Sequence, residues 1–357
     1  MKLFDVPAGA CADISIIDST TRINKLPTEF LMRPPLEGMP FMPEVPTWSF
    51  LIESATGRKA LFDLGVPPNW RDFAPPISDN LKKRNWDIQS EKHVADILKE
   101  HQIEPASINH VIWSHWHWDH LGDPSTFPPS TELIVGPGFK AAFWPGWPKK
   151  VDAPVRESDF AGREVREINF DEGQGLQIGK FKAWDLFEDG SFYLLDTPGH
   201  AVGHLSGLVR TTQDPDTFIF LGGDLCHNGG EIRPSEYIPL PREIHVEIPS
   251  HLGPVICPGA ELEALNDKRG RGPKQPFFEP SMGLSIEEAI KTITKVQEFD
   301  ADDNVLFLYA HSGAVRSHAE LFPAKANNWR EKGWREKMFW DFLKDFQVAL
   351  QGMKAAI

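Results

Sequence analysis

Short apolar runs alternate with amphipathic stretches along the first half of the chain. Two apolar-rich runs, at 47–53 and 59–64, flank a turn that contains Gly57, which favours a hairpin. Residues 93–101 carry apolar side chains at the i, i+3, i+4 spacing of an amphipathic helix, and the β-branched and aromatic run 111–113 then predicts a buried strand. The predicted order is therefore strand, helix, strand.

The second half repeats this alternation. A helix is predicted to begin at Ser285, because Glu288 lies three residues later in a capping pattern and apolar residues then recur at helical spacing. A terminal helical region is expected at about 327–354, and residues 145–165 are expected to form surface loop. Further strands are predicted at 131–135, 191–195, 217–221 and 304–309.

The composition predicts a soluble globular protein with a sizeable core. The chain has 357 residues, of which 41% are hydrophobic and 25% are charged. A formal net charge of -14 argues against a general binder of phosphate backbones, so we expect no nucleic-acid partner. Three cysteines without a C-x-x-C pair indicate neither a disulfide framework nor a thiolate zinc site, and no apolar run is long enough for a signal or a membrane span. We therefore expect a cytoplasmic protein without a membrane partner.

The densest chemistry lies in the hexapeptide at 115–120. It holds three imidazoles and one carboxylate, His115, His117, Asp119 and His120, immediately after the strand predicted at 111–113. Residues two apart in an extended chain point the same way, so His115 and His117 can share one ion, while Asp119 and His120 can reach a second. A decorative surface motif is the weaker interpretation for four potential ligands in six residues.

Three further candidate ligands occur where predicted strands end. His200 follows the turn Thr197-Pro198-Gly199, Asp224 follows two glycines, and His311 follows the strand at 304–309. Each alone would more often be a structural residue, but their shared position at strand ends favours one common site. His204, four residues after His200, is assigned a supporting role.

In this order, these motifs resemble the metallo-β-lactamase superfamily, and the earlier Phe62-Asp63-Leu64-Gly65 belongs to the same pattern. The resemblance spans about 47–311 and implies an α/β fold, an αββα sandwich of two mixed sheets flanked by helices. It implies a single domain over 1–357, with an N-terminal extension at about 1–46, an insertion at about 228–283 and the C-terminal helical region at about 327–354. It also implies two divalent metal ions, the first held by His115, His117 and His200, the second by Asp119, His120 and His311, and both bridged by Asp224.

Within this superfamily the chain is most similar to dinuclear N-acyl-homoserine lactonases and fungal lactonase-like proteins. The resemblance implies a metal-bound hydroxide as nucleophile, with Asp119 taking and returning a proton. His227 stands where such lactonases often have a tyrosine, and we predict that it supplies the corresponding hydrogen bond; an inert loop histidine is an equal alternative. Zinc is favoured by the histidine-rich ligand set, although manganese, iron and cobalt also suit it.

We expect a small apolar or aromatic substrate, with loop aromatics at Trp116, Trp118, Trp144, Trp147, Phe277 and Phe278 as a floor or roof for its pocket. Hydrolysis of a lactone, as in quorum quenching, is the leading hypothesis. A γ-lactamase or a cyclic-carbamate hydrolase acting on a benzoxazolinone-like compound, as in detoxification, is the alternative, with a glyoxalase-II-like thioesterase as a third. A nuclease is disfavoured by the net charge, and an oxygen-reducing di-iron protein by His117, where a carboxylate would be expected. The oligomeric state is left open, a homodimer being one option.

Overall fold

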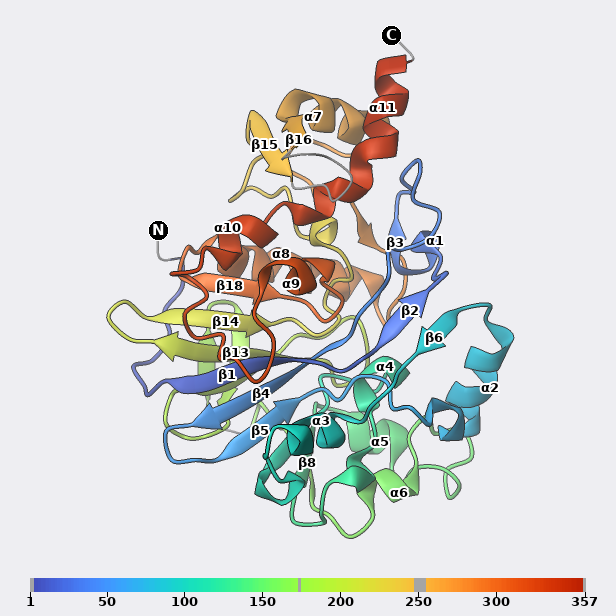
Figure 1. The fold of residues 1–357 in the computed structure, drawn as a ribbon, viewed down its shortest axis with the longest axis vertical. Coiled ribbons are helices and arrows are strands. Elements are labelled where there is room, and N and C mark those ends of the chain that lie inside the picture. Colours follow the sequence, from blue (N-terminus) through green and yellow to red (C-terminus); the bar gives the residue numbers. More distant parts are fainter. Residues whose placement is uncertain (1–2, 173–174, 247–254, 356–357) are drawn as a thin grey trace.

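The protein is built on two six-stranded mixed sheets that pack face to face, with helices on their outer faces (Figure 1). The computed structural model describes residues 3–172, 175–246 and 255–355. This arrangement is the predicted αββα sandwich. Among the described residues, none of the helices is both long and apolar enough to cross a membrane.

The first sheet joins an antiparallel half to a parallel half. In spatial order it contains β1 (Ala12–Asp18), β4 (Trp48–Ser54), β5 (Lys59–Phe62), β7 (His110–Ile112), β8 (Glu132–Val135) and β9 (Val165–Glu167). The pairs from β1 to β5 are antiparallel and those from β5 to β9 are parallel. The parallel half therefore ends its strands at one edge of the sheet, where the motif after β7 emerges.

The second sheet is antiparallel except for its last pair. Its order is β10 (Leu176–Ile178), β11 (Phe181–Asp185), β12 (Phe192–Asp196), β13 (Leu205–Thr212), β14 (Thr217–Leu221) and β18 (Val305–Leu308). β14 and β18 are parallel, with Leu221 opposite Leu308. Their carboxyl ends lie side by side, which brings together the residues that follow them.

Alternate side chains of each strand face different layers, as the two-residue period of a strand requires. On β4, Phe50 and Ile52 enter the core between the sheets, whereas Leu51 faces α3 (Val94–Glu100) on the outer side. On the second sheet, Phe220 packs under the long helix α8 (Ile286–Ala301). Burying one such large apolar side chain contributes about 1.5–3 kcal/mol, so these layers hold the site edge rigidly.

A third core lies outside the sandwich and joins segments far apart in the sequence. Leu31 from the N-terminal segment, Leu262 from the predicted insertion and Phe346 from the C-terminal region belong to one buried cluster. In Figure 1 the insertion elements stand beside the C-terminal helix α11 at one end of the molecule. The elements of this part are α1 (Thr28–Leu31), β3 (Met32–Arg33), β15 (Glu243–Val246), β16 (Val255–Pro258), α7 (Gly259–Lys268), β17 (Glu279–Pro280) and α11 (Gln347–Ala355).

The remaining elements lie outside the two main sheets. They are β2 (Arg22–Asn24), α2 (Pro75–Lys83), β6 (Asp87–Gln89), α4 (Trp118–Leu121), α5 (Phe139–Phe143), α6 (Glu157–Phe160), α9 (Gly313–His318) and α10 (Trp334–Met338). Short 3₁₀ turns complete the chain at 70–72, 105–107, 124–126, 229–231 and 341–346.

The predicted strands and the two predicted internal helices are present, with bounds that differ by one or two residues. Ser285 caps α8, since its hydroxyl accepts the Glu288 backbone N–H at 3.3 Å. The prediction of loop at 145–165 holds for most of the segment, but α6 and the start of β9 lie within it, and Val155 and Phe160 are buried against the first sheet. The segment described as an N-terminal extension supplies β1, an edge strand of the first sheet. Part of the predicted insertion, 247–254, lies outside the described residues.

Candidate metal centre

The seven predicted ligands lie at one edge of the sandwich, each just beyond the carboxyl end of a strand. His115 to His120 follow β7, His200 follows β12, Asp224 follows β14 and His311 follows β18. Gly223 allows the sharp exit before Asp224, because its φ is +54° and a Cβ there would lie 3.0 Å from the His204 ring and from Ser114. All seven fall into two groups whose ligand atoms lie within 4.8 Å of one another.

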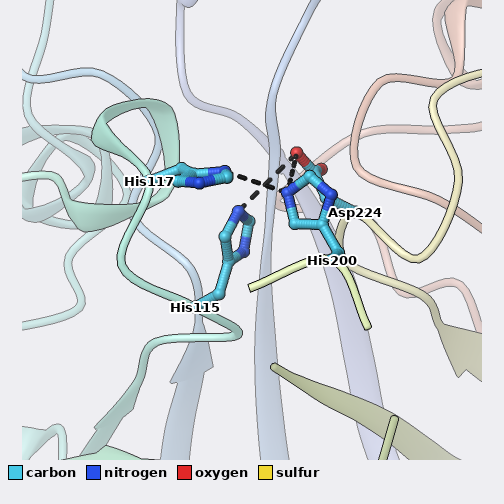
Figure 2. A group of neighbouring side chains, drawn as sticks. All are labelled: His115, His117, His200 and Asp224. Carbon is cyan, nitrogen blue, oxygen red and sulfur yellow. Dashed lines mark hydrogen bonds and ion pairs between the residues drawn. The ribbon is translucent and has the colours of Figure 1, made fainter. Parts of the chain in front are cut away.

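The first group contains His115, His117, His200 and Asp224 (Figure 2). Nδ1 of His117 and Nε2 of His200 are 2.9 Å apart. Oδ2 of Asp224 lies 3.7 Å from Nε2 of His115 and 3.6 Å from Nε2 of His200. Three ring nitrogens and one carboxylate oxygen therefore lie close enough together to hold one zinc-like ion.

The second group contains Asp119, His120, Asp224 and His311. Here the other oxygen of Asp224, Oδ1, lies 3.1 Å from Nε2 of His120 and 3.0 Å from Nε2 of His311. Oδ2 of Asp119 is 3.6 Å from the same nitrogen of His311. Asp224 thus presents one oxygen to each group, which is the geometry of a carboxylate shared by two ions.

These residues fit a pair of divalent cations. Nε2 of His115 is buried without a hydrogen-bond partner in the described part of the protein, and Nε2 of His120 faces Oδ1 of Asp224 at 3.1 Å without the geometry of a hydrogen bond. Unpaired polar atoms in a protein interior are costly, and the two cations would satisfy these atoms. Burial also lowers the pKa of His117 to about 3, which keeps its ring neutral and its lone pair free for a metal.

Proton release is expected to accompany metal uptake at the second group. Burial acts to lower the pKa of His120, but the carboxylates of Asp224, Asp63 and Asp119 outweigh it and raise that pKa well above its usual value. Without metal the ring therefore holds a proton that a cation must displace.

Asp63 anchors the motif from beneath. Its Oδ2 accepts the Nδ1–H of His120 at 2.8 Å and the hydroxyl of Ser114 at 2.8 Å, while Oδ1 accepts the Ser114 backbone N–H at 2.7 Å. The Asp63 side chain is buried, and its backbone has a φ of +59°. The sequence analysis included Asp63 in the motif without a role. Its position after a strand and close to a glycine was the available signal.

Replacing Asp63 by asparagine is expected to weaken metal binding by roughly 10–100-fold, because a carboxylate that orients a metal-binding histidine also increases its basicity. Asparagine tolerates the positive φ, so backbone strain is avoided. A competition titration against a chromophoric chelator measures the affinity. The matched control is Glu132→Gln, which alters a carboxylate–imidazole pair with His110 at 2.9 Å in the same sheet. Equal metal affinity in both variants would exclude this role for Asp63.

His204 supports Asp224 and belongs to neither group. Its Nε2 accepts the backbone N–H of Asp224 at 3.1 Å, and its Nδ1–H donates to the carbonyl of Thr197 at 3.0 Å. Burial lowers the pKa of His204 to about 4, consistent with an acceptor at Nε2. His204 therefore fixes where Asp224 leaves its strand.

His227 lies at the edge of the centre, with Nε2 3.5 Å from Oδ2 of Asp224. Its backbone N–H donates to Glu231, a buried carboxylate that the sequence analysis did not single out. Burial acts to lower the pKa of His227, but hydrogen bonding to Asp224 and Glu231 raises it to about 10. His227 also lines a cavity of ≈ 200 Å³ together with His311.

The expected aromatic surroundings divide into two sets. Trp116 and Trp118 line a cavity of ≈ 350 Å³ that also includes the candidate ligand His117. Phe277 and Phe278, in contrast, are fully buried in the third core, so the expectation that they roof the pocket was wrong. Trp144 and Trp147 do not line this cavity either, and Trp144 instead stacks on Phe160. The run of apolar neighbours beside the two phenylalanines could not distinguish a pocket wall from a core.

Comparisons with known proteins agree with this geometry. A family model described as the metallo-beta-lactamase superfamily matches residues 42–259. Over 345 residues the chain is 41% identical to the protein named gamma-lactamase FDB1 from Fusarium pseudograminearum (strain CS3096), covering 94% of this chain and 82% of that protein. It is 42% identical to metallo-hydrolase mfmC from Annulohypoxylon moriforme, covering 95% and 88%.

Solved structures show the same fold at lower identity. A crystal structure of a B. thuringiensis AiiA mutant with N-decanoyl-L-homoserine bound at its active site matches with a TM-score of 0.58 and 18% identity. The match covers 89% of this chain and 100% of the other. This likeness concerns the fold alone.

Proposed function

The chain belongs to the metallo-β-lactamase superfamily, and on that premise we propose that it is a hydrolase that opens the ring of a small γ-lactam or cyclic carbamate. The observation that carries the hydrolytic assignment is the position of Asp224, which offers Oδ2 to one ligand group and Oδ1 to the other. Two divalent cations held there would polarise the scissile carbonyl and lower the pKa of a water toward neutrality.

The relatives favour the amide-type ring. The sequence analysis ranked a lactone first, with the γ-lactam or carbamate as its alternative. A protein named gamma-lactamase is 41% identical over nearly the whole chain, whereas a protein named N-acyl homoserine lactonase AttM, from Agrobacterium fabrum, is 31% identical over 34% of it. The lactone remains an arm of the test, because ester and amide rings need the same apparatus.

The chain's own residues have distinct tasks in this proposal. Asp119 lies at the edge of the second group, where its carboxylate can accept a proton and return it. His227 faces Asp224 from the other side and is placed to hold a proton near the leaving atom, which is nitrogen in a lactam and needs protonation to leave. Asp63 orients the His120 ring, and His204 holds the backbone of Asp224 in place.

A turnover screen tests the proposal. We expect metal-loaded protein to hydrolyse at least one of 2-pyrrolidinone, oxindole and 2-benzoxazolinone, with loss of activity after a chelator and recovery after a divalent cation is restored. N-hexanoyl-homoserine lactone, a thioester and a phosphodiester complete the panel. Hydrolysis of the lactone alone would replace the proposed substrate class, and hydrolysis of the phosphodiester alone would overturn the proposed function.

A further inference from the structure

The cavity beside His117 has two aromatic walls. Phe143, Trp116 and His117 form one of them. The ring centroid of Trp116 lies 5.1 Å from that of Phe143 and 4.6 Å from that of His117. The other runs from Trp118 to Trp86, whose rings lie 6.3 Å apart and nearly parallel at 29°, and on to Phe30 at 5.3 Å. Both walls begin at the ligand motif, so a molecule bound between them reaches the metal centre.

Arg84 closes the outer end of the second wall. Its guanidinium lies 4.6 Å from the ring centroid of Phe30 and 4.9 Å from that of Trp86. Among the described residues Arg84 forms no ion pair, and its Nε donates to Asn80 at 3.2 Å. The guanidinium is thus within cation–π distance of both rings and packs against Trp86.

Parts of this cavity come from outside the stretch that the family model matches. Phe30 lies in α1 and Met282 lies beyond residue 259, and both line the cavity. Trp86 lies between α2 and β6, and residues of α2 line the same cavity. Phe30 and Met282 come from this chain's additions to the sandwich, whereas Trp86, Trp116 and Trp118 lie within the matched stretch.

We propose that this cavity binds a planar aromatic ring fused to the scissile lactam or carbamate, and that Phe30, Arg84 and Trp86 determine this specificity. The inference rests on the proposed function and names its substrate class. Aromatic side chains line the cavity from Phe30 to Trp116, and aromatic rings attract another ring through stacked and edge contacts, which favours a planar aromatic ligand over a puckered one of the same size. A cavity of ≈ 350 Å³ is of the size that holds a small bicyclic molecule.

Equilibrium binding of unreactive probes tests this inference without requiring turnover of a substrate. 2-Naphthol and decahydro-2-naphthol share a carbon skeleton and a hydroxyl group, but only the first is planar. Calorimetry on the metal-loaded protein is expected to show 2-naphthol binding about tenfold tighter, as ~1.4 kcal/mol of stacking would give. Trp86→Leu is expected to remove that preference, and Arg84→Lys, which keeps the charge but not the plane, to reduce it about threefold.

Two matched controls lie outside the cavity. Trp144→Leu removes an exposed tryptophan that stacks on Phe160, and Arg71→Lys alters a guanidinium 4.3 Å from the Trp70 ring. Both should bind the probes as wild type does. Equal affinity of wild type for the two probes, or an unchanged preference in Trp86→Leu, would overturn the inference even if lactams are hydrolysed. A Trp86-dependent preference in a protein that hydrolyses no cyclic substrate would support the cavity and refute the proposed function.

Discussion

Replacing Asp224 by asparagine is expected to lower kcat/KM at least ~10³-fold, a loss of about 4 kcal/mol of transition-state stabilisation. Asp224 is the residue that both ligand groups share, with Oδ1 3.0 Å from His311 and Oδ2 3.6 Å from His200. An asparagine keeps the shape but offers one neutral oxygen in place of two anionic ones. Metal content per chain should therefore fall together with activity.

Steady-state kinetics and elemental analysis of the same preparations measure both effects. The control is Asp303→Asn, at an aspartate whose side chain is 73% exposed and whose contact with Arg335 is 3.8 Å. An Asp224→Asn protein that kept two ions per chain and near wild-type kcat/KM would contradict the shared-carboxylate geometry. Circular dichroism would show whether the variant retains its fold.

The clustering of the seven candidate ligands could be predicted because each of them stands at a strand end that local sequence marks. The motif follows a short buried run, and Asp224 follows Gly222-Gly223. Parallel pairing of β14 with β18 then places Asp224 beside His311. This pairing joins residues 87 positions apart in the chain, so spatial proximity itself needed the family resemblance rather than local pattern.

Other features depended on contacts that no local pattern reveals. Asp63 has its role only because β5 pairs with β7 and brings it against Ser114 and His120. Phe277 and Phe278 were misplaced because an aromatic run looks the same in a pocket wall and in a core, and the third core exists only when three distant segments meet.

The strand β1 was missed in the sequence analysis for a different reason. Ala12, Ile14 and Ile16 alternate with other residues and face the core between the sheets, so a period-two signal was present. It was hidden because both faces of the strand are largely buried and the next position, Ile17, is apolar as well. Strand recognition by alternation is weakest where a strand is covered on both sides.

Replacing His227 by alanine is expected to lower kcat by about 10²-fold with little change in KM or metal content. Nε2 of His227 lies 3.5 Å from Asp224 and the ring is stacked 5.9 Å from His311, yet His227 is in neither ligand group. A side chain so placed can serve the reacting atoms without holding a cation. Loss of kcat alone is therefore the signature that separates this role from ligation.

The alternative is that His227 is only a buried loop residue whose backbone N–H is held by Glu231. Truncation at Cβ keeps that backbone contact, so a purely structural histidine would leave kcat unchanged in a folded Ala variant. The control is His245→Ala, an exposed histidine on β15. Exogenous imidazole separates the two roles further. The alanine variant loses its ring beside a cavity of ≈ 200 Å³, through which added imidazole can reach the vacated position. Partial recovery of kcat with imidazole in the His227 variant, and none in His245→Ala, is the expected result; loss of a bound metal ion would instead make His227 an eighth ligand.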